Sequence, residues 1–325
     1  MSSSQCAPKD VPVSVGIDVA KATLEVASFP EGLTLSPDNS AAGFRELMSA
    51  LKKYQVERVV MEATGAYERK VAAELLSAGY TVVIANPRQV RDFARGLGIL
   101  AKTDKIDAAV IAKFADVVKP KPRPRPSVEH EELRALVARR RQLADLKVQE
   151  KCHLEAAAEK HARRSIEKVL KVLNAQIGHL DTLICESIEA DDELRHKNEI
   201  IDSPKGIGLQ TSSMLLARLP ELGTLNRQKI ASLAGVAPWD VQSGPWKGKK
   251  RIWGGRSDVR RALYMAAVSA RNDNPVIREF AQRLENAGKP FNVVIVACMR
   301  KLLVILNTMI RNDTKWQSRP LQNCR

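Results

Sequence analysis

The sequence has little of what secreted and membrane proteins need. Its five cysteines lie far apart and form no C-x-x-C pair, so neither a disulfide framework nor a zinc finger is predicted. No uninterrupted apolar stretch reaches the roughly 18 residues that a membrane span requires. The first ten residues also lack a basic segment followed by an apolar run. These absences predict a soluble cytoplasmic protein with reduced thiols and no membrane partner.

Acidic residues are outnumbered by basic ones. The 52 lysines and arginines exceed the 37 aspartates and glutamates, which gives a formal net charge of +15. Such a surface attracts nucleic acid, because each phosphate that it neutralises releases condensed counterions. An acidic membrane would instead require an amphipathic basic helix or a lipid anchor, and neither is evident. Charge therefore predicts a nucleic-acid partner, with a protein that is merely basic as the alternative.

The N-terminal third alternates between strand and helix patterns. The predicted elements are, in order, a hairpin within 11–29, a short strand near 33–35, a helix over 43–54, a strand over 57–61, a helix over 67–78 and a strand over 81–85, with a further helix after them. This order suits a mixed sheet flanked by helices. An RNase H-like fold has the same order, so an α/β domain of that kind is predicted over residues 8–118.

A basic, proline-rich strap ends this domain. Residues 119–126 read KPKPRPRP, and alternating prolines keep such a segment extended. Residues 128–201 then contain no proline and one glycine, and apolar side chains at helical spacing predict two long helices that form a coiled-coil arm. Strap and arm together are predicted to cover 119–201, and a mostly helical domain to cover 202–325. The four cations of the strap are candidate nucleic-acid contacts: Lys119, Lys121, Arg123 and Arg125.

Four carboxylates stand where a site is expected. Asp18 follows the apolar strand in VSVGIDVAK, and Glu62 ends another in VVMEATGAY. Asp104 and Asp107, in KTDKIDAAVIAKFA, share one face at the start of a helix. Clustered carboxylate oxygens are ligands that Mg²⁺ or Mn²⁺ prefers. Taken one by one, these residues could also begin a turn, cap a helix or complement a helix N-terminus.

The motifs resemble those of a known family. GIDVAKATLEV, MEATGAYE and KTDKIDAAVIA are similar, in order and spacing, to the motifs of the insertion-sequence one-ten family, DEDD transposases related to the Piv invertases. SPKGIGLQTSSMLLARL, LAGVAPWDVQSGPWKGKKRIWGGRSDVRRALYMAA and NAGKPFNVVIVACMRKLL resemble the family's C-terminal transposase domain. The resemblance implies that Asp18, Glu62, Asp104 and Asp107 form a RuvC-like tetrad for divalent metal. It also implies that Ser243, in QSGP, is a nucleophilic serine.

The surroundings of Ser243 can be interpreted in two ways. A Ser-Gly-Pro sequence is ordinarily a turn, but the cations that follow it could neutralise a phosphate. These cations are Lys247, Lys249, Lys250, Arg251, Arg256, Arg260 and Arg261. Upstream, Gly206 and Gly208 resemble the turn of a helix-hairpin-helix element, which offers backbone N–H groups to a phosphate, although a simple tight turn is the alternative. Three tryptophans spaced seven apart, Trp239, Trp246 and Trp253, are expected to pack rather than to stack on bases.

The resemblance implies a recombinase that excises and inserts an insertion sequence. It would act through a covalent serine–DNA intermediate, on donor and target DNA, with a structured guide RNA and as a homodimer or homotetramer in the bacterial cytoplasm. A Piv-like site-specific invertase would keep the same residues. A RuvC-like junction endonuclease would use the carboxylates and water without the serine. A nucleic-acid-binding protein without catalytic activity is the alternative from a different class.

Overall fold

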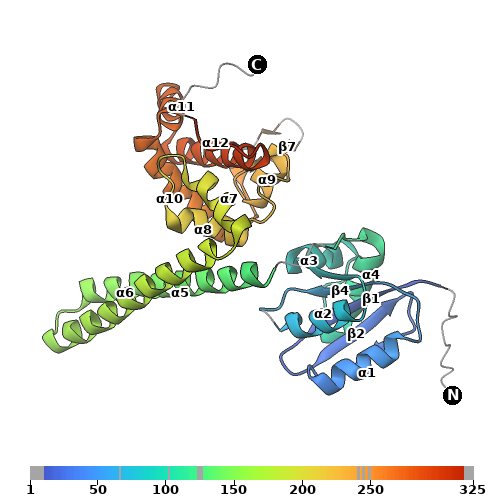
Figure 1. The fold of residues 1–325 in the computed structure, drawn as a ribbon. Coiled ribbons are helices and arrows are strands. Elements are labelled where there is room, and N and C mark those ends of the chain that lie inside the picture. The colour runs from blue at the N-terminus through green and yellow to red at the C-terminus, as the bar shows by residue number, and fades with distance from the viewer. Residues whose placement is uncertain are drawn as a thin grey trace. The chain divides into compact units, whose positions relative to one another are not determined.

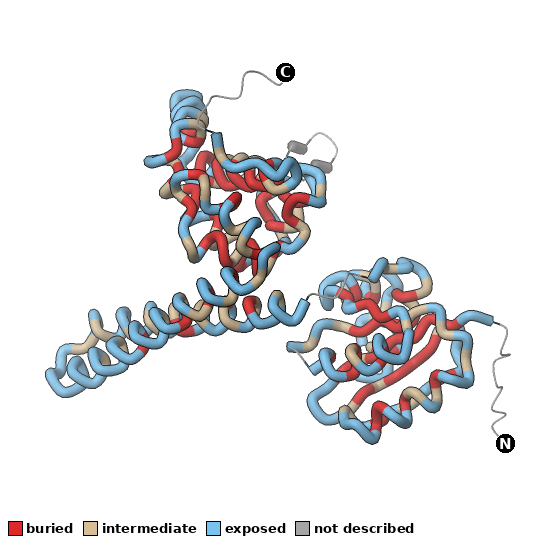
Figure 2. Tube along the Cα trace, viewed as in Figure 1, coloured by how far each residue is buried: buried red, intermediate tan, exposed pale blue. Residues whose placement is uncertain are grey.

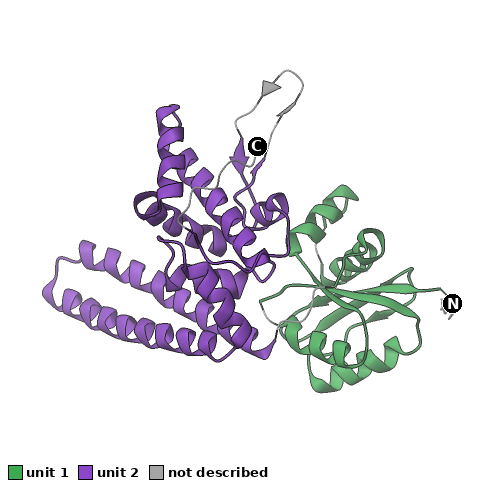
Figure 3. Cartoon of the chain, turned by 45° about the horizontal axis from the view of Figure 1, so that its top comes forward, with its two compact units in different colours: residues 1–125 green, residues 126–325 purple. Residues whose placement is uncertain are grey.

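The computed structural model describes residues 11–65, 67–101, 103–122, 127–239, 242–243, 246–247 and 250–317. The chain divides into two compact units, residues 1–125 and 126–325 (Figures 1 and 3). Each unit has a hydrophobic core of its own (Figure 2). The predicted arm therefore belongs to the same compact unit as the C-terminal helices.

Unit 1 confirms the predicted mixed α/β domain. Its elements are β1 (Val13–Val19), β2 (Leu24–Phe29), β3 (Thr34–Leu35), α1 (Ala41–Leu51), β4 (Val56–Glu62), α2 (Glu68–Ser77), β5 (Val82–Ala85), α3 (Pro87–Gly96) and α4 (Asp104–Val118). The sequence predicted one helix after the last strand, and the structure has two, because a short polar helix, α3, precedes α4.

The five strands form one sheet in the order β3-β2-β1-β4-β5. The first three are antiparallel, whereas β1, β4 and β5 run parallel. Alternate residues of a strand point to opposite faces, and the sheet accordingly has two cores. On one face, Ile17 and Met61 pack with residues of α1 and α2. On the other face, Val60 packs with residues of α3 and α4. Parallel strands buried on both faces are typical of such layered sheets.

Gly16, in the middle of β1, lets α4 lie directly on the sheet. A Cβ atom built on Gly16 would come 2.2 Å from the backbone nitrogen of Ala112 and 2.4 Å from the carbonyl oxygen of Ala108. Backbone atoms of a packed helix cannot give way as a flexible side chain can. The absence of a side chain at this position therefore sets the distance between α4 and β1.

We expect Gly16→Ala to destabilise unit 1 by about 1–3 kcal/mol, as overpacking of a filled core does. Urea unfolding of the full chain, followed by circular dichroism, measures the loss. Gly96→Ala is the matched control, since a Cβ atom there would meet nothing within 4 Å, and it is expected to be neutral or slightly stabilising. Equal stability of the two variants would show that α4 does not depend on the glycine.

Unit 2 is mostly helical. Its elements are α5 (Val128–Ala156), α6 (Lys160–Glu189), α7 (Asp192–Asp202), α8 (Leu209–Arg218), α9 (Arg227–Leu233), β6 (Pro238–Trp239), β7 (Gln242–Ser243), β8 (Trp246–Lys247), β9 (Arg251–Ile252), α10 (Ser257–Asp273), α11 (Pro275–Asn286) and α12 (Phe291–Arg311). The two long helices predicted for the arm are α5 and α6. They lie side by side as a hairpin (Figure 1).

The hairpin has a thin apolar seam and a broader base. Along the seam Leu143, Leu173 and Leu180 are buried. At the base, apolar residues of α5 and α6, among them Leu133 and Ile184, join the core built by the C-terminal helices. This shared core is the physical reason why the arm and the C-terminal helices form one unit.

The helix α12 is long and apolar enough to cross a membrane by length and composition, with a mean hydropathy of 2.1 over 18 residues, and it is the one such helix in the described part of the chain. Half of that stretch is buried within the structure. Ile295, Leu302 and Leu306 are completely buried in the unit 2 core. Packing within the protein therefore accounts for the apolar character of α12.

Candidate active site

Two of the predicted carboxylates lie on neighbouring strands of unit 1. In the parallel pairing of β1 with β4, Ile17 lies opposite Met61, so Asp18 and Glu62 are the next residues along the two strands. Successive side chains of a strand point to opposite faces of the sheet. Ile17 and Met61 point to the face that α1 and α2 cover, so the next residues point to the face that α3 and α4 cover. Asp18 and Glu62 therefore lie on the α4 face of the sheet, where their strands end.

The other two carboxylates lie in the first turn of α4. Thr103 caps this helix, with its hydroxyl oxygen accepting a hydrogen bond from the backbone N–H of Ile106 at 3.3 Å. Asp104 is exposed and Asp107 is partly buried. Both positions favour a negative charge, because the free N–H groups of a helix N-terminus carry a partial positive charge. The negative charge of the two side chains thus complements the dipole of α4 at its N-terminus.

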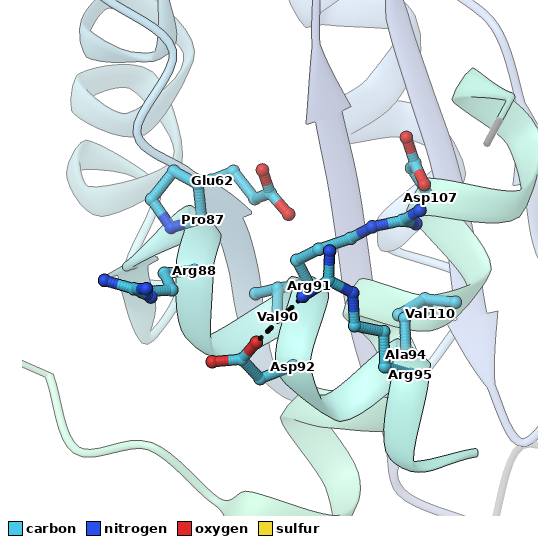
Figure 4. A pocket seen from close by; sticks show the side chains of 10 residues that line it. All are labelled: Glu62, Pro87, Arg88, Val90, Arg91, Asp92, Ala94, Arg95, Asp107 and Val110. Atoms are coloured by element: carbon cyan, nitrogen blue, oxygen red, sulfur yellow. Dashed lines mark ion pairs between the residues drawn. The ribbon is translucent and has the colours of Figure 1, made fainter. Parts of the chain in front are cut away.

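A pocket of about 470 Å³ contains one predicted carboxylate from the strands and one from α4. Glu62 from β4 and Asp107 from α4 both line it (Figure 4). The remaining polar lining comes from α3, whose arginines stand beside the two carboxylates. The lining residues of α3 are Pro87, Arg88, Val90, Arg91, Asp92, Ala94 and Arg95.

The predicted tetrad is not drawn together into one metal-binding group. Among the residues that the structure describes, no three side chains of His, Cys, Asp or Glu are placed to hold one ion. Glu62 and Asp107 share the pocket, and Asp18 lies beside Glu62 in the strand register. The chemistry of the donors fits a hard divalent cation, because all four are carboxylates.

The serine predicted as nucleophile lies in unit 2, where four short strands form two separate two-stranded sheets. Ser243 of β7 pairs with Trp246 of β8, and β6 pairs with β9. The tryptophans expected to pack do not all do so. Trp239 keeps 51% of its surface exposed and Trp253 keeps 64%, so the packing prediction is wrong for these two.

Several of the predicted phosphate-binding cations bond within unit 2. Arg256 makes a two-pronged ion pair with Glu221, at 2.6 and 2.7 Å. Arg260 donates to the carbonyl oxygen of Gly254 at 2.6 Å, and Arg261 donates to Asp145 at 2.8 Å. Lys250 and Arg251 are exposed.

The strap and the serine loop are described only in part. Lys119 and Lys121 are exposed. The predicted contacts at Arg123, Arg125 and Lys249 lie outside the described residues, and Lys247 is described by its backbone alone.

The two glycines of the predicted hairpin turn have different surroundings. A Cβ atom on Gly206 would come 2.6 Å from the backbone nitrogen of Ala270, and its φ of 98° is one that other residues rarely adopt. Gly208 caps α8, and a Cβ atom there would meet nothing within 4 Å. Gly206 therefore brings the turn against α10, whereas Gly208 leaves the N-terminus of α8 open.

A buried carboxylate ties α8, α10 and the arm together. Asp258 is 8% exposed, and it accepts hydrogen bonds from Arg218 at 2.6 Å and from the backbone N–H of Val259 at 3.0 Å. Arg141 of α5 lies 3.8 Å away. Burial by itself raises the pKa of Asp258, but the charge of Arg218 and these hydrogen bonds together lower it below its usual range.

Asp258→Asn is expected to destabilise the chain by about 1.5–3 kcal/mol at neutral pH, the range for hydrogen bonds to charged groups. Since the folded-state pKa is lowered, this contribution is present above the ordinary aspartate pKa and is lost as the pH falls through the lower, folded value. Wild type and variant should therefore converge below about pH 4, as measured by urea unfolding. Asp145→Asn, at a carboxylate whose side chain is 50% exposed, should cost much less, and a pH-independent difference would contradict this account.

Comparison with known proteins decides the family. Residues 15–161 match a DEDD-type family of the IS110 kind, described as "Transposase", and residues 198–282 match the "Transposase IS116/IS110/IS902 family". A pilin gene-inverting protein of Moraxella bovis is 30% identical over 316 residues, which cover 94% of this chain and 98% of the relative. The chain belongs to the IS110 transposase family. It is therefore a DNA transposase or recombinase, an enzyme of DNA strand cleavage and rejoining.

Other relatives agree with this placement. A pilin gene-inverting protein of Moraxella lacunata is also 30% identical over 316 residues, with 98% of the relative covered. The insertion element IS110 uncharacterized 43.6 kDa protein of Streptomyces coelicolor is 28% identical over 123 residues, which cover 37% of this chain and 30% of that protein. These matches confirm the family that the sequence motifs predicted. All four carboxylates lie within the first matched range of the IS110 family, and Ser243 lies within the second.

Two features of this IS110 family member were missed from the sequence. Glu68, in MEATGAYE, is 7% exposed, and its carboxylate accepts hydrogen bonds from the backbone N–H and the hydroxyl of Thr64 at 3.2 and 3.4 Å. It thereby holds the loop that follows Glu62. Arg88, Arg91 and Arg95 recur at helical spacing in PRQVRDFARG, and this spacing was the available signal for a basic helix face at the pocket.

Proposed function

We propose that this chain mobilises a DNA segment by metal-assisted phosphoryl transfer, with Ser243 as the nucleophile. The observation that carries the proposal is the placement of three acidic residues. Asp18 and Glu62 lie side by side near the ends of two neighbouring parallel strands, and Glu62 lines the same pocket as Asp107 of α4. Carboxylates that come from separate strands and helices and lie together at one end of a sheet are typical of a site for phosphoryl transfer.

The fold of unit 1 supports a RuvC-like, RNase H-like assignment. Its sheet has the order β3-β2-β1-β4-β5, with three antiparallel strands followed by two parallel ones. Apart from the additional helix α3, the element order agrees with the one expected of an RNase H-like domain. In this arrangement the first strand carries Asp18 and lies at the centre of the sheet, between β2 and β4.

Asp18, Glu62, Asp104 and Asp107 would hold Mg²⁺ or Mn²⁺ in the proposed site. When bound, the metal would stabilise negative charge on the attacking and leaving oxygens of the phosphodiester. The chain's own part is to bring the carboxylates together. Strand register aligns Asp18 with Glu62, Gly16 seats α4 on the sheet, and Thr103 starts that helix at Asp104.

The serine would form and then release a bond to DNA. In the proposed step the Ser243 hydroxyl loses its proton, its oxygen bonds to the phosphorus, and the bond from phosphorus to the leaving sugar oxygen breaks as that oxygen takes up a proton. Attack by another DNA hydroxyl on the serine phosphodiester reverses these changes and joins new ends. The exposed cations Lys250, just before β9, and Arg251, in β9, would offset the phosphate charge.

Further partners belong to the same proposal. Donor and target DNA, a structured guide RNA and assembly into a homodimer or homotetramer are proposed from the family. The formal net charge of +15 supports binding of nucleic acid without identifying which kind. The strap residues Lys119, Lys121, Arg123 and Arg125, the open N-terminus of α8 at Gly208 and the cations after Ser243 are the proposed contacts.

Site-specific inversion is the second candidate function. It is favoured by the 30% identity to the two pilin gene-inverting proteins, each covered over 98% of its length. An invertase would use the same carboxylates and the same serine. The two functions differ in the DNA product and not in the residues.

A plasmid assay separates the two functions. The gene is placed with its native flanking DNA on a plasmid, and junctions between the element ends are amplified, together with inverted flanks. Excision and insertion junctions would support transposition, and inverted flanks alone would support the invertase. A wild-type protein that binds DNA and yields neither product would contradict the proposed recombination.

A further inference from the structure

The helix α3 presents a row of arginines to the candidate active site. Arg88, Arg91 and Arg95 are spaced three and four residues apart, which places them on one side of a helix. All three line the pocket that Glu62 and Asp107 also line (Figure 4). We call these three residues the α3 arginine face.

The rest of α3 fixes this face in place. Asn86 caps the helix by accepting a hydrogen bond from the backbone N–H of Arg88 at 2.9 Å. Val90 and Ala94 are buried in the core beneath it. The ring of Phe93 meets the ring of Phe114 of α4 edge to face, with centroids 5.5 Å apart. These contacts fix the backbone of α3 against α4, while its arginine side chains extend from that backbone.

The guanidinium groups of Arg91 and Arg95 are held loosely enough to exchange partners. Arg91 donates to the carbonyl oxygen of Leu100 at 3.1 Å. Arg95 lies 3.7 Å from Asp92, with the two side chains 63% and 62% exposed. An ion pair so exposed is screened by water and stabilises little. A phosphate, which bears a full negative charge and accepts two parallel N–H bonds from one guanidinium, competes well for such groups.

Charges of both signs around one pocket point to a phosphodiester as the ligand. The carboxylates of Glu62 and Asp107 repel a bare phosphate. Three arginines on the neighbouring helix line the same pocket and attract the phosphate. We propose that the α3 arginine face binds the backbone of the DNA strand that enters the acidic pocket and positions its phosphates beside the carboxylates. This inference rests on the proposed function of the pocket as the cleavage site.

A second basic surface of unit 1 provides a matched control. Arg45 on α1 and Lys52, the residue that follows this helix, line another hollow, of about 410 Å³, together with Glu74. None of the four predicted carboxylates lines it. A double substitution there removes two positive charges from the same unit without touching α3. The control therefore distinguishes a specific contact from the general effect of net charge.

The test is DNA binding as a function of salt. The full-length wild type, Arg91→Gln/Arg95→Gln and Arg45→Gln/Lys52→Gln are titrated against a fluorescent duplex carrying the element end, between about 50 and 200 mM salt, with Mg²⁺ held constant. Each lost phosphate contact reduces the slope of log K against log salt by about 0.9 for duplex DNA and about 0.7 for single strands. We expect the α3 double variant to reduce the slope by about 1.4–1.8. The α1 double variant should keep the wild-type slope.

Arg91→Lys/Arg95→Lys provides a further measurement. Lysine keeps the charge and loses the planar fork, so we expect it to restore the salt slope but not the KM for strand cleavage. If the glutamine double variant is poorly folded by circular dichroism, Arg95→Gln alone, at a side chain 63% exposed, is expected to reduce the slope by about 0.7–0.9.

Three outcomes test DNA binding by the α3 arginine face separately from DNA cleavage at the acidic pocket. A wild-type slope in the α3 variants overturns the inference about the arginine face, whatever the catalytic result. A changed slope with a structured RNA hairpin, and none with DNA, also overturns it. Strand cleavage that persists in Glu62→Gln, together with a reduced slope in the α3 variants, would instead contradict the cleavage site while leaving the DNA contact supported.

Discussion

Glu62→Gln and Asp107→Asn are each expected to reduce DNA strand cleavage by at least about two to three orders of magnitude, the loss typical when one electrostatic stabiliser of a transition state is removed. Each substitution keeps the size of the side chain and removes its negative charge. A neutral amide is a poorer ligand for a hard divalent cation than a carboxylate. Cleavage of a labelled element-end duplex, measured as a single-turnover rate with Mg²⁺, gives the effect directly.

Asp116→Asn is the control for these variants. Asp116 lies on α4, as Asp107 does, but nine residues further along and outside the pocket lining. It should cleave at the wild-type rate, and all three variants should bind DNA. Equal activity of Asp107→Asn and Asp116→Asn would remove Asp107 from the site. Loss of folding in Glu62→Gln, detected by circular dichroism, would mean that the rate reports stability rather than chemistry.

Ser243→Ala is expected to abolish recombination, with a loss of about four orders of magnitude or more, as for nucleophiles that act together with a wider catalytic apparatus. Removing the hydroxyl removes the atom that would bond to phosphorus. The acidic pocket would be intact, because it lies in unit 1 and the serine lies in unit 2. The plasmid junction assay measures the product, and a filter assay shows that DNA binding is retained.

Ser269→Ala serves as the matched serine control. Its hydroxyl donates to Asp273 within α10 at 3.1 Å, and we expect junctions at the wild-type level. If Ser243→Ala still cleaved DNA at the wild-type rate, the serine mechanism would be wrong and a junction endonuclease that uses water would be favoured. If neither variant differed from wild type in recombination, the nucleophile would have to lie elsewhere.

Much of unit 1 could be predicted because its signals are local. Apolar side chains up to Ile17 and Met61 mark two buried strands, and the carboxylates after these residues come to the same end of the sheet because β1 and β4 are parallel neighbours. The helix α3 could not be found in this way. Of the ten residues in this helix only Val90 and Ala94 are buried, so its apolar periodicity is too short to stand out.

Other features depended on residues distant in the sequence. Gly16 is critical because Ala108 and Ala112 of α4 lie against it, and nothing near position 16 announces that contact. The many basic residues after Ser243 predicted a phosphate-binding surface. One of them, Arg256, instead pairs with Glu221, which lies 35 residues earlier in the chain. Trp239 and Trp253 look like core residues by composition, and the structure leaves both largely exposed.

The most direct test of the proposed mechanism is to look for a covalent bond between the protein and DNA. Wild type, Glu62→Gln and Ser243→Ala are incubated with an end-labelled element-end duplex and Mg²⁺, denatured, and separated on a gel, and the labelled peptide is identified by mass spectrometry. We predict a covalent adduct for wild type alone, mapped to Ser243. Cleaved DNA with no attached protein in the wild-type reaction, or an adduct mapped to another residue, would contradict the account.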